Sequence, residues 1–353
     1  MMKTNITAAL VLCFALQTSG QASSSATPVS VTMEDVYAAG LNGDMKTGLD
    51  LLDRVSDRGL TKKDQVARAA LLERFKDGVA PALNVPEPFA KEVVSMFQDY
   101  WHKCLLGQAS AADAETDLFH TLDALLAKFG RKVDGAASLD DLDDALHGRL
   151  REEGYYALTG MTPPLRELML WRKETVRNYD VKLPESTQRV KVVFMDEFTL
   201  LGWAGYATAD VYHSAGWTKP DALYCVQDSY DVHSESFKVS YLAHEAQHFA
   251  DHKVFPDLEA PELEYRAKLV ELSEAHKTMA DLLDQFSHQT SEDRDNPHGF
   301  ANLRLMRRMS QRLSSSQSAW QEPATRAGWN PNAIRKAALD LLHEDSRDLQ
   351  ARK

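Results

Sequence analysis

The sequence has few cysteines, no cluster of basic residues and no hydrophobic run long enough to cross a membrane. Its apolar stretch at residues 6–16 is shorter than the roughly 20 residues that a membrane-spanning helix needs. Its 52 acidic residues outnumber its 40 basic ones, and the net charge of −12 disfavours nucleic acid and anionic membrane surfaces as partners. The length of 353 residues leaves room for two domains. We therefore expect a globular protein with no nucleic-acid partner and no permanent membrane anchor.

The N-terminus has the pattern of a secretory signal peptide, which we assign to residues 1–26. Lys3 precedes the apolar run, and small and polar residues follow it. Cleavage is expected after Ala22 or after Ala26, because small residues occupy the recognised positions before each. We therefore expect a periplasmic or secreted protein.

Only two of the three cysteines, Cys104 and Cys225, lie outside this expected signal peptide. In an oxidising compartment two such thiols can form a disulfide. Two buried thiols without a disulfide are the alternative interpretation.

Most of the first half of the chain has a helical pattern. From about Val31 to Asp180, apolar residues recur at spacings of three and four. Thr162, Pro163 and Pro164 predict a helix that starts at this point and runs through Trp171. We assign residues 27–180 to a helical domain.

The residue composition changes in the second half, where β-branched and aromatic residues occur in short clusters. Strands are expected at residues 190–194, 201–206 and 222–226. Helices are expected at residues 234–253, 261–288, 299–313 and 331–349. A mostly helical half followed by a small sheet with packed helices predicts an α+β fold, with a second domain at residues 181–353.

A His-Glu-x-x-His motif runs from His244 to His248, inside a segment that is expected to be helical. Residues four apart lie one turn apart on the same helix face, so both imidazoles can bind one ion. Glu245 lies beside such an ion, where a general base can act on a water molecule. The composition produces this pattern by chance only about 0.02 times in such a chain. The motif predicts a zinc site; two histidines on a surface helix are the alternative interpretation.

A catalytic zinc ion usually has three protein ligands and one open position. His252 lies about 12 Å along the helix from His244, which is too far for both to bind one ion. The next predicted helix carries three glutamates, of which Glu264 is the preferred third ligand because it lies at the edge of an apolar stripe. Glu271, on the same face, is the main alternative. Glu262 lies in the first turn, where the helix dipole explains a carboxylate.

With these residues the sequence resembles the gluzincins, thermolysin-like zinc metallopeptidases in which a glutamate from a later helix joins a His-Glu-x-x-His helix. The resemblance covers about residues 188–288. It implies a zincin-like domain with Zn²⁺ bound by His244, His248 and Glu264. It also implies that Glu245 is the general base for peptide-bond hydrolysis.

Peptidases of this class bind substrate as an added strand and stabilise the oxyanion with a histidine or tyrosine. Residues 222–226 are the expected edge strand. His298 is the first candidate for the oxyanion donor, and a capping or merely exposed histidine is the alternative. Tyr206, Tyr224 and Tyr230 are further candidates.

The leading hypothesis is an exported zinc metallopeptidase that acts on a peptide or protein substrate. Amide hydrolysis on a cell-wall peptide is a second reading of the same site. A non-catalytic binding or assembly module with a structural or relic zinc site is the alternative from a different class. Glu245 favours catalysis, because a purely structural site needs no carboxylate beside an open position.

Overall fold

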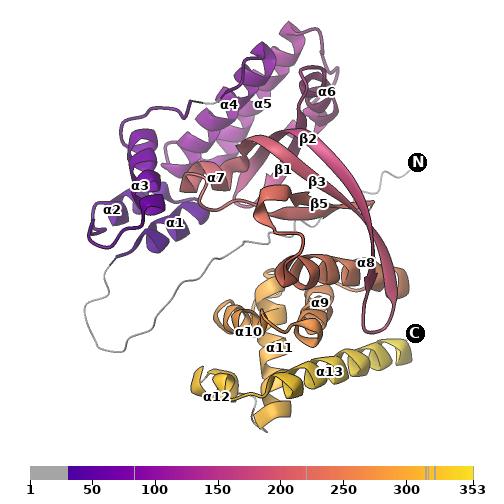
Figure 1. The fold of residues 1–353 in the computed structure, drawn as a ribbon. Coiled ribbons are helices and arrows are strands. Elements are labelled where there is room, and N and C mark those ends of the chain that lie inside the picture. Colours follow the sequence, from indigo (N-terminus) through magenta and orange to yellow (C-terminus); the bar gives the residue numbers. More distant parts are fainter. Residues whose placement is uncertain are drawn as a thin grey trace. The chain divides into compact units, whose positions relative to one another are not determined.

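The computed structural model describes residues 31–82, 84–219, 221–314, 316, 318–321 and 323–352. The expected signal peptide lies outside these residues. The described part combines helices with one sheet, which confirms the α+β class (Figure 1). None of its helices is both long and apolar enough to span a bilayer.

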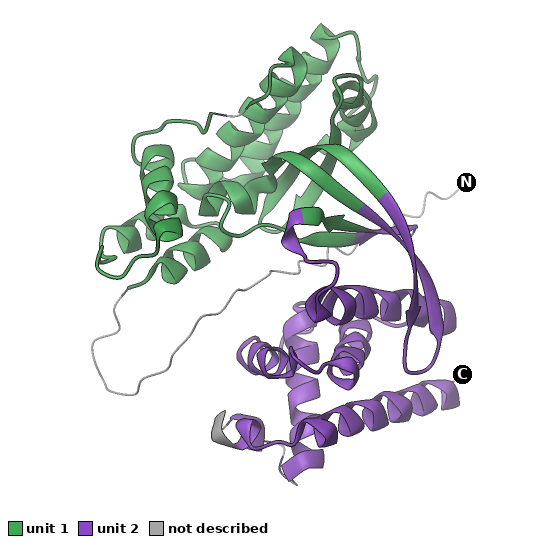
Figure 2. Cartoon of the chain, viewed as in Figure 1, with its two compact units in different colours: residues 1–175, 194–217, 224–227 green, residues 176–193, 218–223, 228–353 purple. Residues whose placement is uncertain are grey.

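The chain forms two compact units, drawn in different colours in Figure 2. Unit 1 consists of residues 1–175, 194–217 and 224–227, and unit 2 of residues 176–193, 218–223 and 228–353. The long strands β2 and β3 each contribute residues to both units.

Unit 1 begins with six helices, α1 (Met33–Leu41), α2 (Met45–Leu52), α3 (Lys62–Phe75), α4 (Pro88–Leu105), α5 (Ala111–Lys128) and α6 (Leu139–Glu152). Side chains define several of their starts: Thr61 and Asp64 form a capping box at α3, as do Ser138 and Asp141 at α6. The helices bury a shared core in which Trp101 is fully covered. Its indole nitrogen donates to the carbonyl of Arg166 at 2.8 Å and so joins α4 to β2.

The sheet has five strands in the order β1-β2-β3-β5-β4. They are β1 (Tyr156–Thr162), β2 (Leu165–Lys182), β3 (Thr187–Leu201), β4 (Gly216–Lys219) and β5 (Ala222–Val226). β1 and β2 pair antiparallel, with Thr162 opposite Leu165 across the two prolines. The strands expected at residues 190–194 and 222–226 are confirmed.

The helix expected from Pro163 through Trp171 is wrong, because this segment is the start of β2. Leu168 and Leu170 lie in the core of unit 1, while Trp171 contacts other aromatic rings, Trp217 among them. Both faces of the strand are therefore buried, which removes the alternation of apolar and polar residues that marks a half-exposed strand.

The strand expected at residues 201–206 is also wrong, because these residues enter the short helix α7 (Gly202–Thr208). Gly202 is required at its start. It has a positive φ of 85°, and a Cβ atom there would lie 2.2 Å from a carboxylate oxygen of Glu167. The first backbone N–H groups of the helix face that carboxylate, and Trp203 N donates to it at 3.0 Å.

The expected edge strand is misplaced by one position. β5 lies between β3 and β4, so β4 forms that edge of the sheet. β4 has only four residues, one of them a lysine, so its sequence does not predict a strand.

Unit 2 contains the helices η2 (Ser236–Ala243, a π-helix), α8 (His244–Val254), α9 (Ala260–Glu274), α10 (Met279–His288), α11 (Pro297–Ser314), α12 (Pro323–Ala327) and α13 (Pro331–Ala351). The described residues also include two 3-10 turns, η1 (Gln227–Ser229), at the boundary of the two units in the sequence, and η3 (Ala319–Gln321) in unit 2. α9 packs against α8, α11 and α13, so it forms the centre of the unit. The single helix expected at residues 261–288 is divided into α9 and α10.

The two cysteines of the described residues, Cys104 and Cys225, form no disulfide. Burial raises the pKa of the Cys104 thiol to about 11, which makes it a poor nucleophile at neutral pH. The disulfide between Cys104 and Cys225, one of the two interpretations of the sequence, is therefore not formed in the structure.

Candidate metal centre

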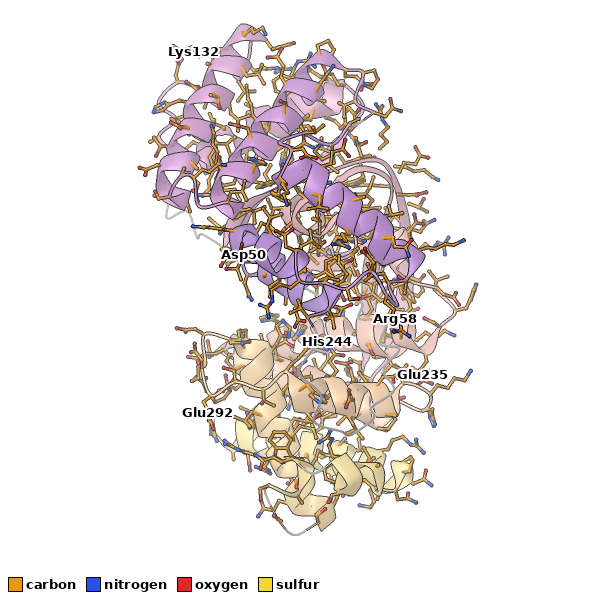
Figure 3. The ribbon with its side chains drawn as sticks, turned by 90° about the vertical axis from the view of Figure 1, so that its left-hand side faces the viewer. Asp50, Arg58, Lys132, Glu235, His244 and Glu292 are labelled. Atoms are coloured by element: carbon orange, nitrogen blue, oxygen red, sulfur yellow. The ribbon has the colours of Figure 1, made fainter. Side chains whose placement is uncertain are left out.

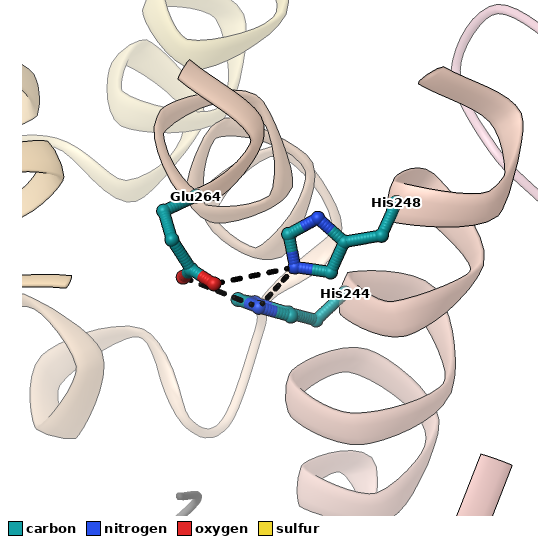
Figure 4. A group of neighbouring side chains, drawn as sticks. All are labelled: His244, His248 and Glu264. Atoms are coloured by element: carbon teal, nitrogen blue, oxygen red, sulfur yellow. Dashed lines mark hydrogen bonds and ion pairs between the residues drawn. The ribbon is translucent and has the colours of Figure 1, made fainter. Parts of the chain in front are cut away.

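The motif histidines lie at the start of α8, directly after the π-helix η2. His244 and His248 project from consecutive turns, with their ring centroids 4.8 Å apart. Their Nε2 atoms lie 3.1 Å apart. Both side chains are buried, and Figure 4 shows that both Nε2 atoms face the same carboxylate.

That carboxylate belongs to Glu264, which α9 presents to α8 (Figure 4). One of its oxygens lies 3.5 Å from His244 Nε2 and the other 3.4 Å from His248 Nε2. The three residues together form a group whose ligand atoms all lie within 4.8 Å of one another. The structure thus brings together the three residues that the sequence proposed as metal ligands.

The spacing of these atoms fits a small tetrahedral ion. Ligands at about 2.0–2.1 Å from a tetrahedral ion lie about 3.3 Å from each other. The observed separations of 3.1, 3.4 and 3.5 Å bracket that value. The group can therefore hold a metal ion without a large rearrangement of its side chains.

Electrostatics at the centre favour a cation. Burial alone lowers the pKa of His244, but the negative charges of Glu271 and Glu264 outweigh it and raise this pKa to about 10. Burial raises the pKa of Glu264, but the charges of His298 and His244 and the contacts with the two motif histidines bring it well below its usual value. Two buried carboxylates, one on each side of the ring, thus attract positive charge to His244.

Glu271 holds His244 from the other side. Its carboxylate lies 2.6 Å from Nδ1 of His244, whereas Glu264 faces Nε2. A carboxylate on Nδ1 fixes the ring so that Nε2 presents a lone pair, which is the usual second partner of a metal-bound histidine. Of the alternatives that the sequence left open, Glu271 is therefore placed to orient a ligand.

Glu262 and His252 lie apart from the centre. Glu262 pairs with Arg294 at 3.0 Å, and His252 is exposed. Neither belongs to the group of converging ligand atoms among the described residues.

Glu245, the expected base, is buried with 1% of its surface exposed. The hydroxyl of Thr218 donates to one of its carboxylate oxygens at 2.5 Å. Thr218 lies on β4, so the edge strand of the sheet orients the expected base. Nothing in the sequence indicates Thr218, because a threonine 27 residues before Glu245 has no characteristic spacing.

His298 is the second residue of α11, and its Nδ1 lies 2.8 Å from Glu264. Its side chain remains 38% exposed. The structure thus places the expected oxyanion donor against the third ligand. Tyr230 packs against the rings of Phe237 and Tyr241, while Tyr206 and Tyr224 belong to unit 1.

A buried ion-pair network fixes α8 against α9. Arg266 donates from Nε to Asp251 at 2.9 Å, and it also pairs with Asp345 at 3.2 Å and Glu185 at 3.4 Å. Gln247, inside the motif, donates to Asp251 at 2.9 Å. Asp251 follows His248 by less than one turn, so this network holds the motif helix in position over Glu264.

Comparison with protein-family models, curated proteins and solved structures finds no match to this chain. The function of the centre is therefore inferred from its own geometry.

Proposed function

We propose that this protein is a metal-dependent hydrolase with zinc bound by His244, His248 and Glu264. The observation that carries the proposal is the convergence of two imidazole nitrogens and a carboxylate at the separations of a tetrahedral ion. Two nitrogens and one oxygen also suit iron(II). Glu245, which follows His244 in the chain and is not one of the three converging ligands, favours hydrolysis and therefore zinc.

Within this class we infer a peptidase, on the strength of the resemblance of residues 188–288 to the gluzincins. Zinc would polarise the carbonyl of the substrate and activate the attacking water. Glu245 would accept a proton from that water as its oxygen bonds to the carbonyl carbon, and pass the proton to the amine as the C–N bond breaks. Thr218 holds the Glu245 carboxylate in place during both transfers.

The burial of the centre supports a second candidate, a structural zinc site in a binding or assembly module. His244, His248 and Glu264 are 3%, 7% and 4% exposed. Structural zinc sites are closed by four protein ligands, whereas the converging group in the described part of the chain has three. The count of ligands therefore supports the hydrolase over the structural site.

Glu245→Gln separates the two functions. Glutamine keeps the shape of the side chain and an acceptor for Thr218, but it cannot take up the proton of the water. We expect stoichiometric zinc, an unchanged fold, and a loss of about 10² to 10⁴-fold in kcat/KM.

The experiment measures zinc and iron by mass spectrometry, and cleavage of a broad library of peptides and cell-wall peptides. Glu274→Gln, an exposed glutamate on α9, is the matched control and should retain activity. Full zinc occupancy with no cleavage by the unaltered protein would favour the structural site. Iron in place of zinc, or equal rates for Glu245→Gln and the unaltered protein, would contradict the proposed mechanism.

A further inference from the structure

Unit 1 contains a cavity of about 130 Å³. It lies between α3, α4, the end of β3 and α7. Its lining consists of Arg74, Pro81, Gln98, the residues 198–201, Tyr206 and Asp210.

Arg74, on α3, is 7% exposed. One terminal nitrogen donates to the carbonyl of Tyr206, and the guanidinium carbon lies 4.5 Å from the centre of the Tyr206 ring. Its Nε has no hydrogen-bond partner among the described residues, and no described carboxylate forms an ion pair with it. A buried arginine is normally paired with an anion. The negative charges of Asp210 and Glu73 act on Arg74 without an ion pair among the described residues, so its Nε has unused capacity for an anionic partner.

Gln98, on α4, is 6% exposed, and its amide nitrogen also has no partner within the described part of the chain. The cavity is thus lined by two buried side chains, from two different helices, each with one nitrogen that lacks an acceptor. Buried donors without acceptors are costly, so a ligand with a negatively charged oxygen would stabilise both.

Asp210 adds an acceptor on the same lining, at an exposed position. It is held there by the backbone: Ala209 and Asp210 have positive φ values of 52° and 59°. The approach is close, since a Cβ atom on Gly205 would lie 2.7 Å from a carboxylate oxygen of Asp210. Such a conformation is unfavourable for residues other than glycine and is often found at functional sites. A carboxylate at this position repels a simple anion and attracts a cationic group.

We propose that this cavity binds a free α-amino acid, with its carboxylate on Arg74 and Gln98 and its ammonium group toward Asp210. The size of the cavity limits the ligand. A cavity of about 150 Å³ accepts benzene, which has six non-hydrogen atoms. A volume of about 130 Å³ therefore fits glycine or alanine.

Titration calorimetry on the full protein tests the ligand class with four probes: glycine, acetate, methylamine and inorganic phosphate. Glycine should bind with one site per chain, and at least tenfold more tightly than each of the other three. Tighter binding of phosphate, equal binding of acetate and glycine, or no saturable binding of glycine would overturn the proposal.

Variants test the residues. Gln98→Leu removes one donor from a similar volume and should weaken glycine binding about tenfold or more. Gln108→Leu, an exposed glutamine of unit 1 outside the cavity, is the matched control and should bind as the unaltered protein does.

Asp210→Asn keeps the shape of an exposed side chain, so this variant tests the proposal even where Gln98→Leu fails to fold. It should weaken glycine binding by tenfold or more and leave acetate binding equal or stronger. Glycine binding that is unchanged in Asp210→Asn would overturn the assignment of the ammonium group.

Discussion

Glu264 and Glu271 lie on one face of α9, yet they contact opposite nitrogens of His244. Glu264 faces the nitrogen that converges with His248, and Glu271 faces the nitrogen that does not. Because the two carboxylates contact different nitrogens, we expect their removal to have different effects. Loss of Glu264 removes one of the proposed metal ligands, whereas loss of Glu271 frees the ring of His244, a proposed ligand that stays in place.

We predict that Glu271→Gln binds zinc about 10 to 100-fold more weakly, because the partners that orient metal ligands typically have effects of this size. Glu264→Ala should lose more affinity than Glu271→Gln. Competition with a chelating dye measures both, and Glu274→Gln provides an exposed control on the same helix. An affinity that is unchanged in Glu271→Gln would show that His244 needs no orienting carboxylate.

Thr218 acts on Glu245 through a single hydroxyl, which makes its contribution separable from its packing. We predict that Thr218→Val lowers kcat about tenfold with little change in KM, because it removes a hydrogen bond to a charged group. Thr218→Ser retains the hydroxyl and should restore most of the rate. The zinc content of both variants should equal that of the unaltered protein. Equal losses in the valine and serine variants would assign the effect to packing.

These residue roles differ in how far the sequence reveals them. His244 and His248 converge because they lie one turn apart on a single helix, so spacing alone predicts their contact. The sequence ranks Glu264 above Glu271 as the third ligand, but it does not predict that Glu271 contacts the other nitrogen of His244, since that contact depends on how α9 turns against α8. Thr218 could not be found at all, because its contact with Glu245 requires β4 to be in place.

Whole elements show the same dependence on tertiary structure. The helices of unit 2 were predictable because their apolar residues follow one period and proline marks several of their starts. The start of β2 has the pattern of a helix because both faces of this half of the strand are buried. The segment of α7 has the composition of a strand, and so short an apolar run has no period that indicates a helix.

The boundary between α9 and α10 depends on a distant side chain. Glu235 accepts hydrogen bonds from the backbone N–H groups of His276, Lys277 and Thr278 at 2.8, 2.6 and 2.9 Å. This carboxylate, labelled with His244 in Figure 3, satisfies the donors that the break in the helix leaves. The apolar pattern across residues 261–288 does not predict the contact with Glu235 or the break in the helix.

The ion pair between Arg266 on α9 and Asp251 on α8 should contribute measurably to the free energy of unfolding. We predict that Arg266→Ala lowers the free energy of unfolding by about 3 to 5 kcal/mol, since Asp251 would remain buried without its arginine. Arg294→Ala, which removes exposed ion pairs to Glu259 and Glu262, should cost much less, because water screens exposed charges.

Urea unfolding of both variants measures the difference. Replacement of both partners, in Arg266→Met with Asp251→Leu, should be less destabilising than Arg266→Ala alone, because no charge is left buried. Similar losses for Arg266→Ala and Arg294→Ala would show that burial does not strengthen this pair.

At the scale of the whole molecule, Figure 3 labels four charged side chains that are exposed, Asp50, Arg58, Lys132 and Glu292. Two glutamates with opposite pKa shifts make the stability depend on pH. Burial raises the pKa of Glu167, in unit 1, to about 7, although the N–H groups of Trp203 and Leu168 act to lower it. Burial also acts to raise the pKa of Glu235, in unit 2, but its hydrogen bonds with residues 276–278 lower it to about 2. An unfolded glutamate titrates near pH 4.3, so the two residues act in different ranges.

We predict that the stability falls on both sides of a maximum near pH 4 to 5. The folded pKa of Glu167 lies above the unfolded value, so its contribution is present below about pH 4.3 and is lost as the pH rises through about 7, at a cost of about 3 kcal/mol. The folded pKa of Glu235 lies below the unfolded value, so its contribution is present above about pH 4.3 and is lost as the pH falls toward 2.

Melting temperatures between pH 2 and 9 for two variants separate these contributions. Glu167→Gln keeps an acceptor for Trp203 and Leu168 but has no charge to bury, so it should be more stable than the unaltered protein at pH 8 and lose that advantage at pH 4. Glu235→Gln should be less stable at pH 7, and the difference should shrink as the pH falls from 4 to 2. A constant offset between Glu167→Gln and the unaltered protein across the whole range would show that Glu167 does not titrate on this scale. Such an offset for Glu235→Gln would mean that the carboxylate holds residues 276–278 by shape alone and not by its charge.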